Sequence, residues 1–397
     1  MKDFKFTDGQ KECINLTEKW YGSLNEQVFE YDGPAGTGKT SIIPEIVKRI
    51  GLDMDEEVLA VAYTGKAASN LTLKGIDASS MHSAFMDVLE VPKRDKYGDI
   101  IYKNGRKLTT LTFVKKHYLP KHIKLIIIDE GFFVDSFMGK ISESFGLPIL
   151  VTGDKWQLPP INGDSYFLNN PDYSLTEITR QAKESGIIEL ATRIRLGQEM
   201  PDKKCRIKND VFILPKREIT DTILLNTDII LCGKNRTRNY FNKRIRKDIL
   251  GINSKLPVKG DKIICRHNYW NRLLGGIPLT NGIIGYVIHD VLKDNINIKD
   301  STIRIDFQPD YVEYDYYESL PIDINFFNDD CGTDKTSNIF TKGIKMELGN
   351  AITTHLAQGS EFDNVLYWDE YMGDSEFMKR LRYTGVTRAK KILVTAI

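Results

Sequence analysis

The chain of 397 residues contains no run of 18 apolar residues, so nothing in it predicts a membrane-spanning helix. Its start, Met1–Phe4, lacks the apolar core of a signal peptide. This favours a cytoplasmic protein, and a phage-encoded protein acting in its host's cytoplasm is one such case. The formal net charge is only +1, so no global excess of basic residues indicates a nucleic-acid binder. Any such function must depend on a local basic track.

The five cysteines do not form a metal-binding pattern. There is no C-x-x-C pair, and only Cys265 has a histidine close by, His267. This spacing argues against zinc and for a reducing compartment. With 41% hydrophobic and 27% charged residues, the composition is typical of a soluble globular protein. At roughly 100–200 residues per domain, the length allows more than one domain.

The clearest motif is Gly-Pro-Ala-Gly-Thr-Gly-Lys-Thr at residues 33–40, which fits G-x-x-x-x-G-K-[ST] without a gap. Its glycines let the backbone curl so that successive N–H groups point at a phosphate. Lys39 adds a charge for the β- and γ-phosphates of a nucleotide, and the Thr40 hydroxyl can hold Mg²⁺. The residues of this P-loop predicted to hold the nucleotide are Gly33, Pro34, Ala35, Gly36, Thr37, Gly38, Lys39 and Thr40.

The segments around the P-loop follow the strand–loop–helix order that the motif requires. Val28–Tyr31 reads as a short strand and Ser41–Ile50 as a helix, which Pro44 in its first turns is expected to kink. Before the strand, Thr7 can cap a further helix. Gln10 carries an amide that can donate to and accept from the edge of adenine. A solvated glutamine at a helix start is the alternative for Gln10.

Paired acids follow a segment that reads as a strand buried on both faces. Leu125–Ile128 is a continuous apolar run, as in a parallel sheet, and it ends in Asp129 and Glu130. There Asp129 would hold the shell of Mg²⁺ and Glu130 would orient the attacking water. A later strand, residues 148–152, leads to Gln157, whose amide could sense the γ-phosphate. A solvated loop is the alternative for either acidic site.

Two stretches are candidate contacts for a nucleic acid. Small and hydroxylic residues around Ser80 and His82 lie where a strand ends and can let a backbone phosphate come close. After a buried-strand run at residues 229–232, seven basic residues in fourteen are interleaved with aromatic ones. They are Lys234, Arg236, Arg238, Lys243, Arg244, Arg246 and Lys247. A solvated helix face is the alternative for this basic run.

Two segments read as insertions. Residues 88–108 are polar, charged and aromatic, with turn signals that predict a small hairpin leaving the first domain. Residues 259–340 show short alternating β segments, with turns such as Thr280-Asn281-Gly282, and predict an inserted small barrel.

Taken in order, these motifs resemble superfamily 1 helicases of class B, the RecD-like and Dda-like group. Gln10 falls on that family's adenine-reading glutamine, residues 33–40 on the Walker A loop and Asp129-Glu130 on Walker B. The resemblance implies a catalytic set of Lys39, Asp129, Glu130, Gln157, Arg180 and Arg388, the two arginines acting as fingers. It adds Gln358, Gly359 and Glu361 of the fifth motif to the nucleotide site. The nucleic-acid contacts that it implies are Thr64, Lys66, Ser80, His82, Thr353 and His355.

The resemblance implies an α/β fold of two RecA-like P-loop NTPase domains. The first would span residues 1–175 and the second residues 176–258 plus 341–397. Residues 88–118 would form a strand-separating pin in the first domain, with Tyr97, Ile101 and Tyr102 at the fork, and residues 259–340 an SH3-like β-barrel in the second. ATP and Mg²⁺, with Thr40 and Asp129 as its ligands, would lie between the domains.

The implied activity is 5′→3′ movement on single-stranded DNA with unwinding of duplex junctions. Single-strand-binding, replication or recombination proteins are candidate partners, and we expect a monomer without membrane attachment. An RNA helicase of the same class and an ATP-controlled DNA-loading factor that does not unwind are the alternatives. In one respect the chain departs from the family, which usually has a small hydroxylic residue two positions after the Walker B glutamate. Here that residue is Phe132.

Overall fold

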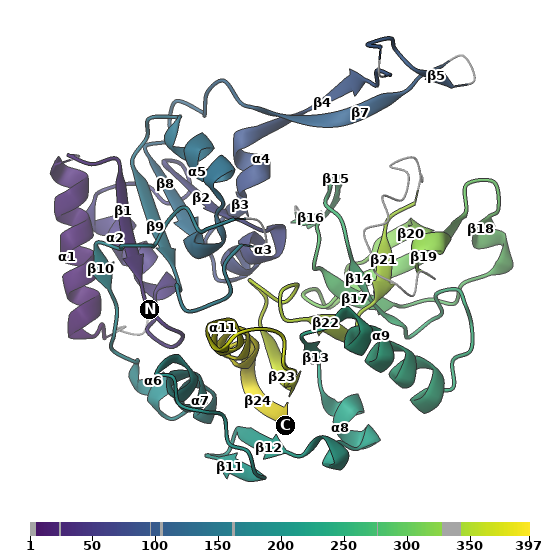
Figure 1. Ribbon diagram of the computed structural model, residues 1–397. Helices are drawn as coiled ribbons and strands as arrows, with labels where there is room; N and C mark the ends of the chain where they lie inside the picture. Colours follow the sequence, from purple (N-terminus) through teal and green to yellow (C-terminus); the bar gives the residue numbers. More distant parts are fainter. Residues whose placement is uncertain are drawn as a thin grey trace.

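The computed structural model describes residues 5–23, 25–95, 97–103, 106–160, 163–275, 277–327 and 343–397. Two α/β domains make up most of these ranges, and each carries a β insertion (Figure 1). Within the described ranges, no helix is long and apolar enough to cross a membrane.

The first domain is built on a parallel sheet of six strands in the order β10-β1-β9-β8-β2-β3. The strands are β1 (Val28–Asp32), β2 (Val58–Ala62), β3 (Ala78–Ser80), β8 (Leu125–Asp129), β9 (Ile149–Gly153) and β10 (Tyr173–Ser174). Both β8 and β9 are buried along their whole length, as their apolar runs predict. The helices are α1 (Asp8–Ser23), α2 (Ile43–Arg49), α3 (Gly65–Leu73), α4 (Met81–Phe85) and α5 (Ser136–Glu143).

The helix predicted over residues 41–50 is divided into two parts. A 3-10 turn covers Thr40–Ile42, and α2 starts at Ile43 with Pro44 in its first turn. The first turn of a helix has N–H groups without an intrahelical acceptor, so proline loses little there. Pro44 therefore marks the start of α2 and does not kink a longer helix.

The second domain is built on six strands in the order β11-β12-β24-β23-β13-β22, parallel except for the β11–β12 pair. These are β11 (Cys205–Ile207), β12 (Val211–Leu214), β13 (Ile229–Cys232), β22 (Ala351–Thr353), β23 (Phe362–Trp368) and β24 (Ala389–Ala396). Its helices are α6 (Arg180–Lys183), α7 (Gly186–Arg195), α8 (Asp221–Asn226), α9 (Asn235–Lys243) and α11 (Ser375–Val386). In Figure 1, α11 lies between the two sheets, on the side of the second domain that faces the first.

The insertion in the first domain, residues 86–115, here called the pin, is longer than the small hairpin predicted at residues 88–108. An antiparallel ribbon of β4 (Met86–Pro92) and β7 (Thr109–Lys115) extends away from the first domain (Figure 1). Near its tip, β5 (Tyr102–Lys103) pairs with β6 (Arg106–Lys107). The ribbon exposes several large apolar side chains along its length, Val88, Leu89, Phe113 and Val114.

The insertion in the second domain is a curled antiparallel half-barrel with its own apolar core. Its sheet consists of β14 (Lys262–Cys265), β17 (Ile284–Val287), β18 (Ile296–Asn297), β19 (Thr302–Pro309), β20 (Tyr317–Asp323) and β21 (Met346–Leu348). A separate hairpin joins β15 (Tyr269–Leu274) to β16 (Ile277–Leu279), and α10 (Ile324–Phe327) follows β20. Because β21 pairs with β14, the half-barrel includes residues beyond position 340.

Candidate ATP and nucleic-acid site

The P-loop, residues 33–40, joins β1 to the 3-10 turn before α2 and curls as its glycines predict. Gly36 and Gly38 have φ angles of +85° and +74°, in the region that side chains disfavour. The Lys39 Nζ donates to the carbonyls of Gly33 (2.7 Å) and Pro34 (3.3 Å), so the ammonium lies within the curl. A curled loop with a lysine inside it has the shape and charge to hold phosphates. The P-loop residues therefore fit a nucleotide.

Gln10 packs directly on the P-loop. Its Nε2 donates to the Thr37 carbonyl (3.0 Å), and its side chain is only 1% exposed. Its Oε1 accepts from the Thr7 N–H (3.0 Å), while the Thr7 hydroxyl accepts from the Gln10 N–H (3.2 Å). This reciprocal pair is a capping box, and the sequence predicted only the cap by Thr7. In this structure the amide steadies the P-loop, and adenine reading by Gln10 stays a prediction.

The two predicted Mg²⁺ ligands lie together. The Thr40 hydroxyl donates to Asp129 Oδ2 (3.4 Å), which links the P-loop to the end of β8. Burial raises the pKa of Asp129. It also raises the pKa of Glu130 to about 7, to which the neighbouring Asp129 contributes, while Arg388 and Lys39 act in the opposite direction. A buried acid beside a half-buried one, with raised pKa values, is a favourable environment for a divalent cation.

A backbone constraint sets the direction of Glu130, whose φ of +55° is unusual for a residue other than glycine. Strained residues of this kind are common at functional sites. Among the described residues, no group of three or more His, Cys, Asp or Glu side chains is arranged to hold a metal ion. Mg²⁺ usually keeps waters and substrate phosphates as most of its ligands, so Thr40 and Asp129 would supply only part of its coordination.

Gln157 and Arg388 meet across the boundary between the domains. Arg388, just after α11, is only 4% exposed and donates through Nη2 to Gln157 Oε1 (3.0 Å). It also donates to the carbonyls of Thr384 (3.1 Å) and Ser360 (3.2 Å) within its own domain. The Arg388 charge also lowers the pKa of Glu130, so Arg388 acts on this predicted catalytic acid as well as bonding to Gln157.

The second predicted finger, Arg180, starts α6, but its side chain lies outside the described part of the structure. The preceding Thr179 donates its N–H to the Gly36 carbonyl (2.9 Å). The start of α6 therefore contacts the P-loop, and the role of Arg180 stays a prediction.

Tyr383, a buried residue of α11, was not predicted as a site residue from the sequence. Its hydroxyl donates to Asp154 Oδ2 (2.6 Å) and accepts from the Ala35 N–H (2.9 Å). One hydroxyl of the second domain thus touches both the P-loop and the segment of residues 154–158, here called the 154–158 loop. Within this loop, Leu158 donates its N–H to the Thr384 hydroxyl (2.9 Å). The only sequence signal for Tyr383 was its place five residues before Arg388.

The three fifth-motif residues make contacts to the first domain. Gln358 Nε2 donates to the Leu158 carbonyl (3.0 Å), and Asn70 of α3 donates to the Gly359 carbonyl (2.6 Å). Glu361 pairs with Lys74, just after α3, at 3.6 Å. These contacts join the second domain to the 154–158 loop and to α3. Direct contact of Gln358, Gly359 or Glu361 with a nucleotide stays a prediction.

Thr64, Ser80 and Thr353 cap short segments at strand ends. The hydroxyls of Thr64 and Ser80 accept from Ala67 N (3.2 Å) and Ser83 N (3.2 Å) at the starts of α3 and α4. The Thr353 hydroxyl accepts from Leu356 N (3.3 Å) after β22. Each residue therefore holds a turn at the carboxyl end of a parallel strand, which is where ligands of such sheets bind.

The two predicted histidines are held by aromatic rings. His82 lies edge-on to Tyr63 and to Phe113 of the pin, with centroids 6.1 and 5.9 Å apart. His355 stacks on Phe377 of α11 at 6.0 Å. Burial lowers the pKa of both histidines, so both are neutral near pH 7. They would contact a nucleic acid by hydrogen bonding or stacking more than by charge.

Lys66, predicted to contact a nucleic acid, faces the half-barrel in this structure. It is 7% exposed and pairs with Asp310 at 3.4 Å, with the Tyr311 ring 5.6 Å away. The adjacent Gly65 has no room for a side chain, since an added Cβ would lie 2.5 Å from Thr280 of the half-barrel. The half-barrel thus packs against the turn before α3, and a nucleic-acid contact of Lys66 stays a prediction.

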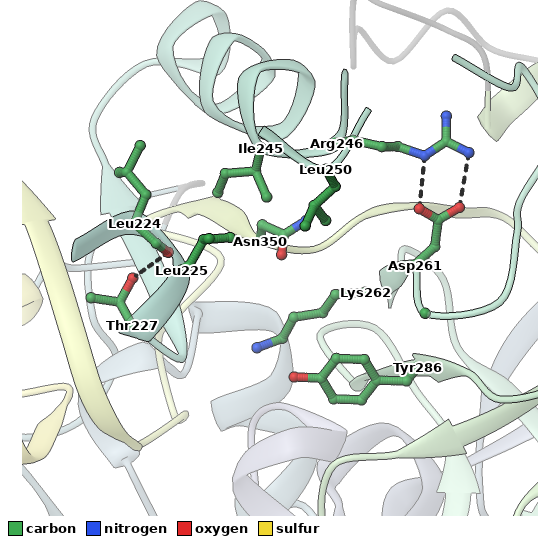
Figure 2. Close-up of a pocket in the computed structure, with 11 residues that line it drawn as sticks. Leu224, Leu225, Thr227, Ile245, Arg246, Leu250, Asp261, Lys262, Tyr286 and Asn350 are labelled. Carbon is green, nitrogen blue, oxygen red and sulfur yellow. Dashed lines mark hydrogen bonds and ion pairs between the residues drawn. The ribbon is translucent and has the colours of Figure 1, made fainter. Parts of the chain in front are cut away.

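Much of the basic run at residues 234–247 is engaged within the fold. Arg238 is buried against Glu347 (3.1 Å), and Arg244 pairs with Asp221 (2.7 Å). Arg246 holds Asp261 through two bonds of 2.7 and 2.9 Å at the root of the half-barrel (Figure 2). A cavity of about 190 Å³ opens beside this pair, and none of its lining residues belongs to the P-loop or to the acid pair. These arginines support the fold, and because Arg238 and Arg246 are buried, this part of the run is not the solvated helix face given as the alternative.

The aromatic residues expected at the fork lie near the tip of the pin. Tyr97 and Tyr102 are 78% and 57% exposed, whereas Ile101 is half-buried and donates its N–H to the Lys93 carbonyl (2.9 Å). Both tyrosines are exposed, and a role in strand separation stays a prediction.

Comparisons with known proteins agree with this geometry. Residues 7–209 match the family described as AAA domain, and residues 348–394 match the UvrD-like helicase C-terminal domain. The ATP-dependent DNA helicase Dda of Enterobacteria phage T4 is 28% identical over 210 residues, 50% of this chain and 44% of that protein. The RecBCD enzyme subunit RecD of Buchnera aphidicola is 24% identical over 453 residues, 97% of this chain and 72% of that protein. The chain spans less than half the length of several other curated relatives.

Solved structures share the fold. Pif1 of Bacteroides bound to single-stranded DNA superposes with a TM-score of 0.56 at 18% identity, over 100% of this chain and 93% of that one. The two matched families together cover both halves of the ATP site described above. The chain therefore belongs to the superfamily 1 class B helicases, the family of RecD-, Pif1- and Dda-like proteins.

Proposed function

We propose that this protein is an ATP-dependent DNA helicase that moves 5′→3′ along single-stranded DNA and unwinds duplex junctions. The observation that carries the proposal is the bond from Arg388 to Gln157 across the domain boundary, beside Glu130. With this bond, the hydrolytic site would contain side chains from both domains. A site divided in this way lets hydrolysis depend on how the domains lie, which a motor requires.

In the proposed reaction, the P-loop amides and Lys39 bind the phosphates of ATP. Mg²⁺, held by Thr40 and Asp129, would supply charge neutralisation at the β- and γ-phosphates. Glu130 accepts a proton from the attacking water at its carboxylate, and its raised pKa of about 7 makes it a stronger base than an ordinary glutamate. Arg388 stabilises the charge that develops on the transferred phosphoryl group.

Binding of ATP competes with contacts that the structure contains. Lys39 must exchange the Gly33 and Pro34 carbonyls for phosphate oxygens, and the Ala35 N–H must exchange the Tyr383 hydroxyl. The second exchange changes a contact between domains. ATP binding would therefore alter the grip of α11 on the first domain, and product release would restore it.

The strand path is supported by residues from both domains. Thr64, Ser80 and His82 lie at the strand ends of the first sheet, and Thr353 and His355 at those of the second. Such polar contacts would bind a phosphate backbone with little sequence preference. The names of Dda and of the Pif1 complex, a DNA helicase and a protein bound to single-stranded DNA, favour DNA over RNA as the ligand.

The experiment is ATP turnover measured without nucleic acid and with single-stranded DNA or RNA of matched sequence. Stimulation by DNA is the expected result. Greater stimulation by RNA would favour an RNA helicase, and no stimulation by either would refute the proposal.

A strand-displacement assay on a forked duplex tests unwinding separately. Residues 93–106 of the pin are replaced by a short Gly-Ser turn, which leaves most of the β4–β7 ribbon in place. We expect DNA-stimulated ATP turnover to remain and strand displacement to fail, because an exposed aromatic side chain can stack on the last base pair and block it. Equal displacement per ATP in both proteins would make the pin a surface loop. A parent protein that turns over ATP on DNA without displacing strands would be a loading factor.

A further inference from the structure

Phe132, the residue at which the chain departs from its family, contacts the second domain. It lies in a 3-10 turn, Gly131–Phe133, directly after Glu130, and its side chain is 7% exposed. The guanidinium of Arg380, from α11, lies 5.5 Å from the centroid of the Phe132 ring. A cation over an aromatic face is attracted to it, most strongly where water is excluded.

The same guanidinium also holds the 154–158 loop. Arg380 Nη1 donates to the carbonyls of Lys155 (2.6 Å) and Gln157 (3.0 Å), and Nε donates to Glu376 (3.2 Å) one turn earlier in α11. Arg380 therefore joins α11 to both segments of the first domain that lead into the hydrolytic site.

On the side of the first domain, the backbone around Phe132 has little freedom. A Cβ at Gly131 would lie 2.3 Å from Val151 Cγ1, and a Cβ at Gly153 would lie 3.0 Å from Gly131 N. The turn that carries Phe132 is thus packed closely against β9, with the Val151 side chain and the Gly153 backbone as its neighbours. Movement of the Phe132 ring would be transmitted to the backbone of Glu130, two residues away.

On the side of the second domain, α11 leads to a predicted DNA contact. Phe377, one turn before Arg380, stacks on the His355 ring with an interplanar angle of 27°. Residues three apart in a helix lie on the same face. His355 is thus linked to Phe377 and Arg380 to Phe132 by ring contacts, while α11 joins Phe377 to Arg380 and the backbone joins Phe132 to Glu130.

We propose that the contact between Phe132 and Arg380 couples the position of α11 to Glu130, so that DNA bound at His355 sets the rate of ATP hydrolysis. The proposal rests on the proposed function and specifies its regulation. Phe132 and Arg380 are positioning residues, since neither would touch ATP. A packed contact of this kind transmits a change only if α11 has two arrangements, one with DNA and one without.

The test is a double-mutant cycle read out as the ratio of kcat for ATP with saturating single-stranded DNA to kcat without it. Phe132→Leu removes the ring and keeps an apolar side chain, and Arg380→Ala removes the cation. Each should lower the ratio about three- to tenfold, the range expected for one partly desolvated cation–π contact. The double variant should lower it no further, and KM for ATP should stay within about twofold.

Three controls separate coupling from structural damage. Phe132→Tyr retains the ring and should keep the parent ratio. Arg380→Lys retains the charge without the planar fork and should lower the ratio, as Arg380→Ala does. Arg382→Ala removes an arginine of the same helix whose partner, Asp369, belongs to the second domain, and should keep the parent ratio.

Additive losses in the double variant, or parent-like ratios in both single variants, would overturn the coupling. Should Phe132→Leu fail to fold, the contrast between Phe132→Tyr and Arg380→Lys decides, and equal ratios in these two would also overturn it. A parent protein that DNA does not stimulate would refute the proposed function and the coupling with it. If DNA stimulates ATP turnover by the parent protein and the variants still fail these tests, only the coupling is refuted.

Discussion

Arg388→Ala removes the guanidinium that bonds from the second domain to the side-chain amide of Gln157. The side chain is buried and makes four donor contacts, three of them inside its own domain. Its removal therefore affects two things that can be measured apart. One is the charge available to the transition state, and the other is the pKa of Glu130.

The expected loss of turnover is about 10³-fold or more, the usual contribution of an arginine finger. This corresponds to roughly 4 kcal/mol of transition-state stabilisation. Nucleotide affinity should stay within a few-fold, because Lys39 and the P-loop amides are untouched. Some loss of stability is expected as well, since the Thr384 and Ser360 carbonyls lose a buried donor.

The pH dependence gives a second signature. Arg388 lowers the pKa of Glu130, against burial and Asp129, which raise it to about 7. Without Arg388 that pKa rises further. Glu130 can accept a proton from water only as a carboxylate, so a higher pKa means less active enzyme at a given pH. The acid limb of the pH–turnover profile should therefore move to higher pH.

The assay is steady-state ATP turnover with saturating single-stranded DNA between about pH 6 and 9, the range in which this carboxyl titrates. Nucleotide affinity is measured separately by equilibrium titration with a fluorescent ADP analogue. Arg382→Ala is the matched control, because it removes a guanidinium from the same region and breaks only the pair with Asp369. Parent-like turnover in Arg388→Ala would refute the divided site. Reduced turnover with an unmoved acid limb would refute the electrostatic link to Glu130.

Three further predictions concern single side chains. Lys39→Ala should abolish turnover and weaken nucleotide binding in an equilibrium titration, and parent-like affinity would contradict its role. Burial raises the pKa of Glu30 to about 7, so its contribution to stability is present below pH 4.5 and lost as pH rises through 7. Above pH 7, the free energy of unfolding of Glu30→Gln should thus exceed that of the parent by up to about 3 kcal/mol, measured by denaturant unfolding. A difference between the two proteins that does not change with pH would contradict this. Tyr383→Phe leaves buried Asp154 without that donor and should cost about 1.5–3 kcal/mol of unfolding free energy, while an unchanged value would show that another donor replaces the hydroxyl.

The nucleotide half of the site could be predicted from sequence because its signals are local. The P-loop carries its own glycines, lysine and threonine within eight residues. The acids Asp129 and Glu130 follow an apolar run that could only be a buried strand, and that strand is β8. Parallel strands meet at one edge, so the proximity of Thr40 to Asp129 followed from topology alone.

The contacts between domains could not be predicted in the same way. Tyr383 and Arg380 stand in an amphipathic helix where an aromatic and a cation are ordinary residues. Their roles depend on partners more than 200 positions away, at Asp154 and Phe132. No periodicity or spacing links such distant positions, so only the arrangement of the two domains reveals them.

The basic run at residues 234–247 is a second case in which partners that the sequence does not reveal decide the role of a residue. Clustered cations favour an interface with nucleic acid when their partners are unknown. The partners of Arg238 and Arg246 are Glu347 and Asp261, one in the strand that ends the half-barrel and one just before its first strand. A cation committed to a buried carboxylate is not available to a phosphate. Arg238 and Arg246 are therefore poor candidates for DNA contact, and the strand-end residues remain the predicted contacts.

Because the predicted strand-end contacts carry few charges, the position of α11 would matter for the response to DNA. Contacts made mostly by neutral hydroxyls and rings supply little of the electrostatic attraction that usually dominates DNA affinity. The response to DNA would then depend on geometry. Two features of α11 meet this need: Phe377 stacks on His355 near one end, and Tyr383 occupies the Ala35 amide near the other. DNA and ATP would act on opposite ends of one short helix. A displacement of α11 by either ligand would therefore change the binding site of the other.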